Sequence, residues 1–320
     1  MIVNGLISTL EILVFPGVLF LLLLAFFYEW IDRKMVARIQ SRYGPLYTGP
    51  AGILQPFTDF LKLLFKEDIT PKTADRPIFF FTPVIYLALS LTILFIIPIT
   101  NKTGLVAFEG DLIFTLLLLT LMVITIFLAG WSSMSRFSLI GSIRAALQML
   151  SYEIPLSLAI IGPAMVAGSL SISRIVEWQT FNTWMILLQP FGFGILVMCL
   201  LAELEFVPFD IPHAETEIVA GWKTEFSGRK LALFRLGKNL ELVFASAFIA
   251  SLYLGGAQEV WLIPPVIIFL IKTTLTVMLL SLLKSLFARF RIDQMISGMW
   301  RYLLPLAIFQ VILIQVGLGG

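Results

Sequence analysis

The sequence predicts an all-α integral membrane protein with eight transmembrane helices and an interfacial amphipathic helix between spans 1 and 2. Composition is the first reason, because 59% of the 320 residues are hydrophobic and only 13% are charged, unlike a soluble globular protein. The second is a set of apolar runs long enough for a hydrocarbon core of about 30 Å, which a helix crosses in roughly 20 residues. These runs cover residues 10–30, 78–100, 112–130, 139–169, 184–204, 232–254, 262–287 and 297–317.

The runs fit one continuous unit. No internal repeat is visible, so residues 1–320 are expected to form a single polytopic membrane domain. The first run is too long and too early for a cleaved signal peptide, which indicates a retained first span. The run at 139–169 is longer than one span requires, so we expect a helix that is tilted, or broken at Pro155 or Pro163.

Positive charges are distributed unevenly among the predicted loops. The loops after spans 1, 3, 5 and 7 hold most of the Lys and Arg, whereas the other loops hold only Lys102 and Arg174 and the termini hold none. Cytoplasmic loops of membrane proteins collect Lys and Arg. We therefore expect a multi-pass protein of the cell (plasma) membrane with cytoplasmic odd-numbered loops and both termini on the outer side.

The first cytoplasmic loop contains two patterned segments. Residues 51–67 have apolar side chains at helical spacing with Asp59, Lys62 and Lys66 opposite, which predicts the interfacial helix. A basic helix face precedes it and is suited either to anionic lipid or to a partner subunit. This face consists of Lys34, Arg38 and Arg42, and Arg33 precedes it.

Ionisable side chains inside predicted spans are the main candidates for function, because they are costly in hydrocarbon and normally face water or a partner. Lys238 and Glu241 share a helix face and can pair, either as a structural ion pair or as a protonatable switch. Arg144 and Glu153 lie on one helix but too far apart to pair. Lys284 and Glu205 lie near span ends, and we expect them to reach the membrane interface.

The loop after span 5 is too apolar for a solvated connector. It carries large apolar side chains between two prolines and several acids, so we expect it to fold against another part of the protein. Its acids are Asp210, Glu215, Glu217 and Glu225, and Glu203 ends the span before it.

The cysteine and histidine content limits redox chemistry within the chain. One cysteine, Cys199, and one histidine, His213, cannot bind a four-thiolate iron–sulfur cluster or a bis-imidazole haem. No metal site and no nucleic-acid signal is predicted, so the metal centres of any redox reaction are expected in other subunits.

Four blocks of sequence together resemble subunit 1 of proton-pumping respiratory complex I, also called the H subunit, and its relatives in membrane-bound hydrogenases. The blocks are Asp32-Arg33-Lys34-Met35-Val36-Ala37-Arg38-Ile39-Gln40 and onward to Asp68, residues 130–155 ending in Ser151-Tyr152-Glu153-Ile154-Pro155, residues 202–228 ending in Glu225-Phe226-Ser227-Gly228, and Arg289-Phe290-Arg291-Ile292-Asp293-Gln294.

This resemblance implies a non-catalytic subunit between a peripheral redox arm and antiporter-like pumping subunits, with buried acids along a wet ion path. The expected path residues, some carried over from the family and some from the spans above, are Arg144, Glu153, Glu203, Asp210, Glu215, Glu217, Glu225, Lys238 and Glu241. The expected peripheral-arm interface consists of Arg33, Lys34, Arg38, Arg42, Phe206, Pro208, Phe209, His213, Arg289, Arg291 and Asp293.

The chain departs from the quinone-reducing members of this family. Leu46-Tyr47 and Phe206 stand where those members tend to have arginines, His213 replaces an acid, and Asp32 replaces a glutamate. In span 6 the usual Ala-Glu-Tyr becomes Gly237-Lys238-Asn239, with Glu241 one turn on. The missing arginines argue against a bound quinone and make the chain more similar to the ferredoxin-linked hydrogenase branch.

We therefore expect the membrane anchor and coupling subunit of a ferredoxin-linked, hydrogenase-type respiratory complex. Its partners would be peripheral hydrogenase-like and iron–sulfur subunits and antiporter-like membrane subunits within the lipid bilayer. No cofactor is expected on this chain; iron–sulfur clusters and a nickel–iron (NiFe) centre would lie in partner subunits. The alternatives are a quinone-binding H subunit of an NADH- or other donor:quinone oxidoreductase, and a stand-alone cation transporter or channel.

Overall fold

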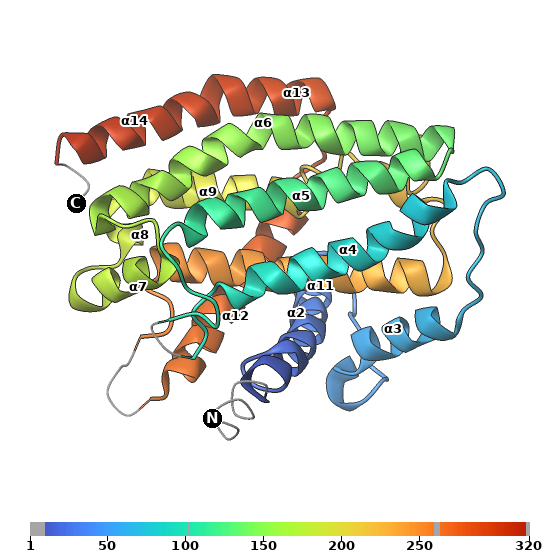
Figure 1. Ribbon diagram of the computed structural model, residues 1–320, viewed down its shortest axis with the longest axis horizontal. Helices are drawn as coiled ribbons and strands as arrows, with labels where there is room; N and C mark the ends of the chain where they lie inside the picture. The colour runs from blue at the N-terminus through green and yellow to red at the C-terminus, as the bar shows by residue number, and fades with distance from the viewer. Residues whose placement is uncertain (1–9, 101–102, 259–262, 318–320) are drawn as a thin grey trace.

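The computed structural model describes residues 10–100, 103–258 and 263–317, and the described residues form helices and loops without a strand. Lys102 lies outside these ranges. The long helices form one bundle, with α13 and α14 at one edge and α2, α3 and α12 toward the other (Figure 1).

Short 3₁₀ or π segments are η1 (Pro50–Gly52), η2 (Gly221–Lys223) and η3 (Met299–Leu303). The α-helices are α2 (Val18–Ile39), α3 (Gln55–Phe65), α4 (Arg76–Phe95), α5 (Asp111–Ser132), α6 (Arg136–Ala167), α7 (Ile172–Phe181), α8 (Met185–Leu188), α9 (Pro190–Glu203), α10 (Glu215–Ile218), α11 (Gly228–Tyr253), α12 (Pro265–Leu286), α13 (Ile292–Gly298) and α14 (Leu304–Gln315).

Six helical stretches of the described chain are long and apolar enough to cross a membrane. Each corresponds to one of the predicted runs, so a multi-pass helical membrane protein is confirmed. The stretches are Leu10–Ile39, Arg76–Phe95, Asp111–Ser132, Arg136–Ala167, Pro265–Leu286 and Ile292–Gln315.

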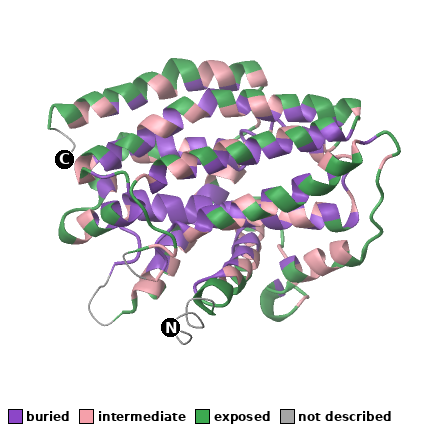
Figure 2. Cartoon of the chain, viewed as in Figure 1, coloured by how far each residue is buried: buried purple, intermediate pink, exposed green. Residues whose placement is uncertain are grey.

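The other two predicted spans coincide with helices that do not meet these criteria. Helix α9 has 14 residues, which at 1.5 Å per residue is about 21 Å and shorter than a hydrocarbon core. Helix α11 has 26 residues but carries charged side chains in its first half. Every residue from Leu240 to Tyr253 is buried (Figure 2). The second half of α11 is therefore surrounded by protein.

The long run at 139–169 forms one unbroken helix. α6 has 32 residues with Pro155 and Pro163 inside it, so it does not break at either proline. At about 48 Å it exceeds the thickness of a hydrocarbon core. Of the two expected outcomes, the structure excludes the broken helix, and the tilt stays a prediction.

The loop between α9 and α11 packs tightly onto the bundle, as predicted. Trp222 is fully buried, and the ring of Phe226 stacks on Phe79 of α4 with centroids 4.1 Å apart. Gly141 of α6 permits this approach, because a Cβ there would lie 2.6 Å from the backbone nitrogen of Trp222 and 2.8 Å from the backbone of Gly221. The loop is thus held by apolar burial against α4, α6 and α11.

Helix α3 forms where the interfacial helix is predicted. It packs on α2 and α11 beside the main bundle (Figure 1). The phenyl rings of Phe57 and Phe60 lie 5.7 Å and 5.6 Å from that of Phe26 on α2. Aromatic contacts with α2 therefore anchor one side of α3.

Candidate functional site

The candidate site is a buried set of charged and hydroxyl side chains where α4, α6, α9 and α11 meet, here called the central polar cluster. Its carboxylates are buried deep in the bundle, with Glu203, Glu205 and Glu241 exposing less than a tenth of their surface. The members of the cluster are Tyr86, Tyr152, Glu203, Glu205, His213, Lys223, Lys238 and Glu241.

The end of α9 supplies two of these carboxylates. Glu203 is the last residue of α9, and Glu205 follows with φ +54°, the left-handed region that helix ends use to reverse the chain. The N–H of Phe206 donates to the carbonyl of Leu201 at 3.1 Å, and the N–H of Glu205 donates to that of Ala202 at 3.1 Å. This closed turn keeps both carboxylates inside the bundle.

Helix α11 supplies a positive charge to the cluster. Lys238 Nζ lies 3.0 Å from Oε2 of Glu241 and 3.3 Å from Oε2 of Glu205. The predicted Lys238–Glu241 pair is therefore present. The expectation that Glu205 reaches the interface is wrong, because Lys238 compensates its charge in the interior.

Two tyrosines complete the buried end of the cluster. The hydroxyl of Tyr86 on α4 donates to Glu241 Oε2 at 2.6 Å, and the hydroxyl of Tyr152 on α6 donates to Glu203 Oε2. A cavity of about 10 Å³ beside Glu203 and Gln148 is about the size of one water molecule. Hydroxyl groups and a water-sized space next to carboxylates provide the elements of a proton path.

The other end of the cluster lies in the loop after α9. Nε2 of His213 is 2.7 Å from Oε2 of Glu205 and 3.2 Å from Nζ of Lys223. One ring nitrogen cannot donate to the carboxylate and accept from the ammonium at once, so its protonation selects the partner. The loop thus connects to the interior through an imidazole that contacts both Glu205 and Lys223.

The charges of this loop shift one another's protonation. Burial lowers the pKa of Lys223 to about 8. Burial acts to raise the pKa of Glu205, but the neighbouring Lys238 and His213 outweigh it and hold that pKa well below its usual range. For Asp210, burial prevails and raises the pKa. The protonation of each of these groups therefore depends on the charges of the others.

The remaining predicted path residues lie outside the central polar cluster. Glu153 is half-buried on α6 and accepts a hydrogen bond at 2.8 Å from Thr120 Oγ1 on α5. Glu215 and Glu217 are exposed on α10, and Glu225 is half-buried. The predicted acids are thus divided between the interior and the surface.

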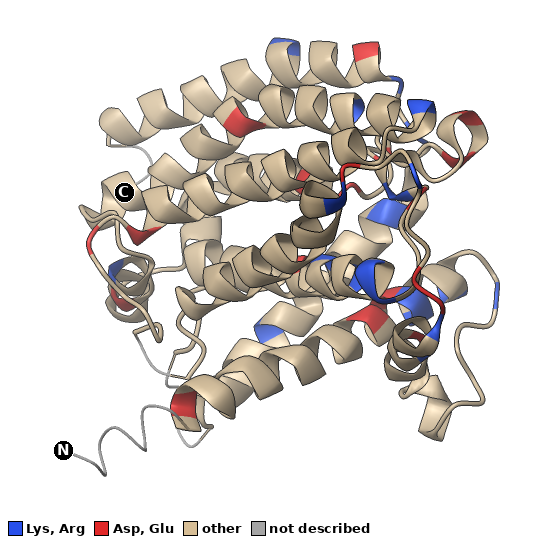
Figure 3. Cartoon of the chain, turned by 45° about the vertical axis from the view of Figure 1, so that its right-hand side comes forward, with Lys and Arg blue, Asp and Glu red and all other residues tan. Residues whose placement is uncertain are grey.

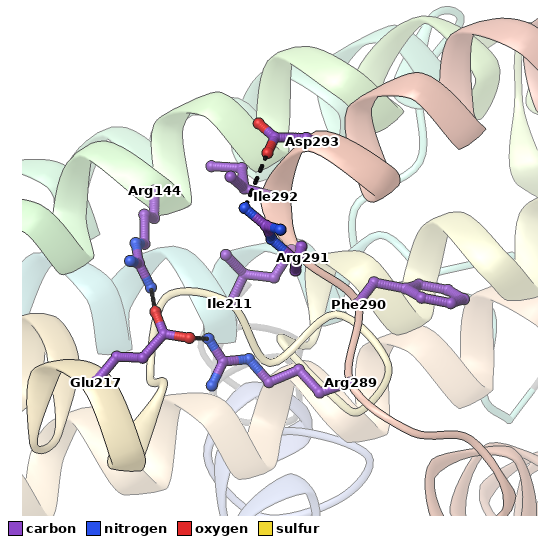
Figure 4. A pocket seen from close by; sticks show the side chains of 8 residues that line it. All are labelled: Arg144, Ile211, Glu217, Arg289, Phe290, Arg291, Ile292 and Asp293. Atoms are coloured by element: carbon purple, nitrogen blue, oxygen red, sulfur yellow. Dashed lines mark hydrogen bonds and ion pairs between the residues drawn. The ribbon is translucent and has the colours of Figure 1, made fainter.

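Arg144 and Glu217 belong to a separate surface group, the arginine pocket, which Figure 4 shows. Glu217 accepts hydrogen bonds from Arg144 at 2.7 Å and from Arg289 at 3.2 Å. The hydrogen bond from Arg144 is the main reason that the pKa of Glu217 is lowered. Arg291, 3.7 Å from Asp293, lines the same pocket.

The predicted interface residues of the first loop have internal partners. Arg33 pairs with Asp59 on α3 at 2.7 Å and with Glu29, while Lys34 Nζ donates to the carbonyls of Pro45 and Ala51. Arg38 and Arg42 are exposed. Two of the four basic residues therefore hold the first loop and α3 in place.

Lys284 also has an internal partner. Its Nζ lies 2.9 Å from Asp32 Oδ2 and 3.8 Å from the centre of the Phe206 ring. Asp32 on α2 therefore compensates the charge of Lys284 at the end of α12, and its reach to the interface stays a prediction.

Several contributors were missed from the sequence. Tyr86, Tyr152 and Lys223 carry no distinctive local pattern, so no signal points to them. Glu29 is different, because it is an ionisable residue within the predicted span 10–30. An ionisable side chain inside a span is the same signal that pointed to Lys238 and Glu241. Glu29 pairs with Arg33 and with Arg235 of α11 at 2.9 Å.

The charged residues gather toward one end of the bundle. Figure 3 shows most of the Lys and Arg near the loops that join α2 to α4 and α9 to α11, with few at the opposite end. Among the described residues, no group of three or more His, Cys, Asp or Glu side chains is arranged to hold a metal ion.

The chain is similar to known proteins over most of its length. The family model described as NADH dehydrogenase matches residues 11–315. The NADH-quinone oxidoreductase H subunit of Dehalococcoides mccartyi (strain CBDB1) is 38% identical over 294 residues, covering 92% of this chain and 82% of that protein. The NADH-quinone oxidoreductase H subunit of Methylococcus capsulatus (strain ATCC 33009 / NCIMB 11132 / Bath) is 37% identical over 283 residues, covering 88% of this chain and 89% of that protein. That of Bacillus thuringiensis (strain Al Hakam) is 39% identical over 286 residues, covering 88% of this chain and 86% of that protein. The chain belongs to the family of complex I H subunits, which are membrane subunits of respiratory complexes.

Proposed function

We propose that this chain is the membrane anchor and coupling subunit of a complex-I-like respiratory complex, and that the central polar cluster carries the coupling. The supporting observation is the unbroken series of close contacts from Lys223 through His213, Glu205 and Lys238 to Glu241. The series begins in the loop that would face the redox arm and ends inside α11. A subunit that served only as a membrane anchor would not need such a series.

Charge balance explains how the series transmits a signal. Three carboxylates share one buried ammonium, so a single positive charge cannot compensate all three when they are ionised together in a low dielectric. A proton that binds His213 at Nε2 strengthens its contact with Glu205 and frees Lys223. The protonated His213 then compensates part of the negative charge of Glu205. Lys238 is thereby left to compensate more of the charge of Glu241.

Glu203 and Glu241 provide the test. In the assembled complex in sealed vesicles, Glu203→Gln and Glu241→Gln are expected to leave electron flow intact and abolish ion pumping. Glu109→Gln is the control, because Glu109 is exposed and pairs with Arg174 away from the cluster. Full coupling in both cluster variants contradicts the proposal.

The topology proposed for this function keeps eight spans. α9 and α11 cross the membrane within the protein interior, where α9 can be short and α11 can be charged because neither needs to face lipid on all sides. The basic end of the bundle (Figure 3) is placed in the cytoplasm by the positive-inside rule. Labelling of single cysteines introduced at Arg42 and Arg174 tests this orientation, with label from the cytoplasmic side expected only at the first.

The complex is proposed to be of the ferredoxin-linked hydrogenase type, with iron–sulfur clusters and a nickel–iron centre in partner subunits. Phe206 supports this choice, since it stacks under Lys284 where quinone-reducing members tend to have arginine. Nickel analysis of the purified complex tests it. Nickel in stoichiometric amount is expected, and its absence rules against the hydrogenase type.

A quinone-binding role is the second candidate, favoured by one observation besides the names of the relatives. A pocket of about 280 Å³ lies between α2, the first loop and Lys284, with Asp32 and Arg33 in its wall. It is large enough for a ring-sized head group. Quinone-dependent activity of the purified complex, lost in Lys284→Met, would establish this role, and its absence in the native complex would exclude it.

A further inference from the structure

The arginine pocket is an open, positively charged hollow of about 340 Å³ between α6, α10 and the segment that joins α12 to α13 (Figure 4). Three guanidinium groups and two carboxylates line it, so the net charge is positive. The proton-coupling function proposed above makes no use of this pocket, and the following inference does not depend on it.

Glu217 occupies the pocket as an internal anion. Its side chain is 51% exposed, whereas those of Arg144 and Arg289 are 24% and 27% exposed. Within the described residues, each of these arginines makes one hydrogen bond, to Glu217. A guanidinium has five N–H donors, so most of the donors of both arginines remain for an added oxyanion.

The pocket lies at the level of a membrane surface. The apolar helix α12 ends at Leu286 and the next apolar stretch begins at Ile292, so Arg289 and Arg291 fall in the turn between two spans. Arg144 is in the third turn of α6, a helix too long for the hydrocarbon core. Basic pockets between spans at this depth suit the head groups of anionic lipids.

An apolar stripe continues from the pocket along α6. Its five side chains recur at intervals of three and four residues, and all are exposed on the described structure. Arg144 shares its helix face with the first and third of them. The stripe consists of Ile140, Ile143, Leu147, Leu150 and Ile154.

We propose that the arginine pocket binds the phosphate of an anionic phospholipid whose acyl chains lie on the α6 stripe, in competition with Glu217. Bidentate guanidinium contacts suit a phosphate diester. The stripe favours a lipid over an acidic peptide, since a soluble acidic segment gains nothing from a lipid-depth apolar face. Glu217 occupies the arginines in the absence of lipid and leaves them when the phosphate enters.

Lipid titration of the purified complex tests the proposal. After delipidation in detergent, phosphatidylglycerol or phosphatidylcholine with the same acyl chains is added, and bound lipid is counted by native mass spectrometry. Phosphatidylglycerol is expected to bind the native complex preferentially. Arg144→Gln and Arg289→Gln are each expected to weaken it about tenfold, because each removes charge-assisted hydrogen bonds. Arg174→Gln, an exposed arginine of another pocket, is expected to change nothing.

Glu217 gives a variant that separates lipid binding from folding. Glu217→Gln removes the internal competitor and is expected to tighten phosphatidylglycerol binding several-fold, whereas a purely structural role for Glu217 predicts weaker binding. Equal lipid binding by the native complex and both arginine variants overturns the proposal. So does inorganic phosphate binding as tightly as phosphatidylglycerol, which marks a free-anion site. Loss of a partner subunit from the arginine variants with lipid binding unchanged marks a protein-docking site and also overturns it.

Discussion

The Nζ atom of Lys238 lies 3.3 Å from Oε2 of Glu205, so the interior of α11 is joined electrostatically to the turn that ends α9. The same ammonium lies 3.0 Å from Glu241 on its own helix. One positive charge therefore links a loop outside the helices to a carboxylate inside them.

Removing the charge of Lys238 is expected to destabilise the protein strongly. Lys238→Met leaves Glu205 and Glu241 buried without a compensating ammonium, which costs about 3–5 kcal/mol. The measurement is thermal unfolding of the detergent-solubilised complex. Lys238→Met combined with Glu205→Gln is expected to recover part of the loss. If the single variant is as stable as the native protein, the ion pair does not hold these helices together.

Removing one hydroxyl is expected to impair coupling with a small effect on stability. Tyr86→Phe deletes the 2.6 Å hydrogen bond to Glu241 and costs about 1–2 kcal/mol, because a charged acceptor loses its donor. Ions moved per electron, measured in vesicles, are expected to fall. Tyr302→Phe, at an exposed tyrosine, is the control and should behave as the native protein. Unchanged ion transport in Tyr86→Phe removes this tyrosine from the path.

Coupling is expected to change with pH through Lys223. Burial lowers the pKa of Lys223 from 10.5 to about 8, so this ammonium loses its proton near pH 8 and its positive charge beside His213 disappears. Between pH 8 and 10.5 the unfolded chain binds the proton more strongly, so the contribution of Lys223 to stability rises with pH across this window. A transition in ion transport near pH 8, present in the native complex and absent from Lys223→Met, is the expected result.

The low pKa of Glu205 makes stability rise with pH on the acid side as well. The contribution of Glu205 to stability is present above its ordinary pKa of 4.5 and is lost as the pH falls below that value. Stability measured against pH in Lys223→Met and in Glu205→Gln separates the two groups. An alkaline transition that survives in Lys223→Met would falsify its assignment to this lysine.

The docking of the loop on α6 is expected to fail when Gly141 is enlarged. The new Cβ of Gly141→Ala would meet the backbone of Gly221 and Trp222 at 2.8 Å and 2.6 Å, and overpacking of this kind costs about 1–3 kcal/mol. Faster proteolysis of the loop in the intact complex is the readout. Gly194→Ala on α9, where no atom lies within 4 Å of the added methyl group, is the matched control. Equal protease resistance of both variants contradicts close docking.

Part of the candidate site could be predicted because it depends on local spacing. Lys238 and Glu241 are three residues apart on a helix, so their pairing follows from helical geometry. The apolar character of the loop after α9 predicted its docking, and Trp222 is fully buried in it. For α11, the apolar run predicted a helix, but its burial on all sides from Leu240 onward appears only in the bundle.

By itself, the sequence determined that this is a helical, multi-pass membrane protein, since composition and the length of apolar runs decide whether a chain partitions into a bilayer. It also determined the family, through motifs spread over most of the chain. Only the tertiary structure decided that Glu205 is buried, that Tyr86 and Tyr152 bond to the carboxylates, and that Glu217 lies at the surface with Arg144. These contacts join residues far apart in the chain, and the packing of helices that creates them is not encoded in local periodicity.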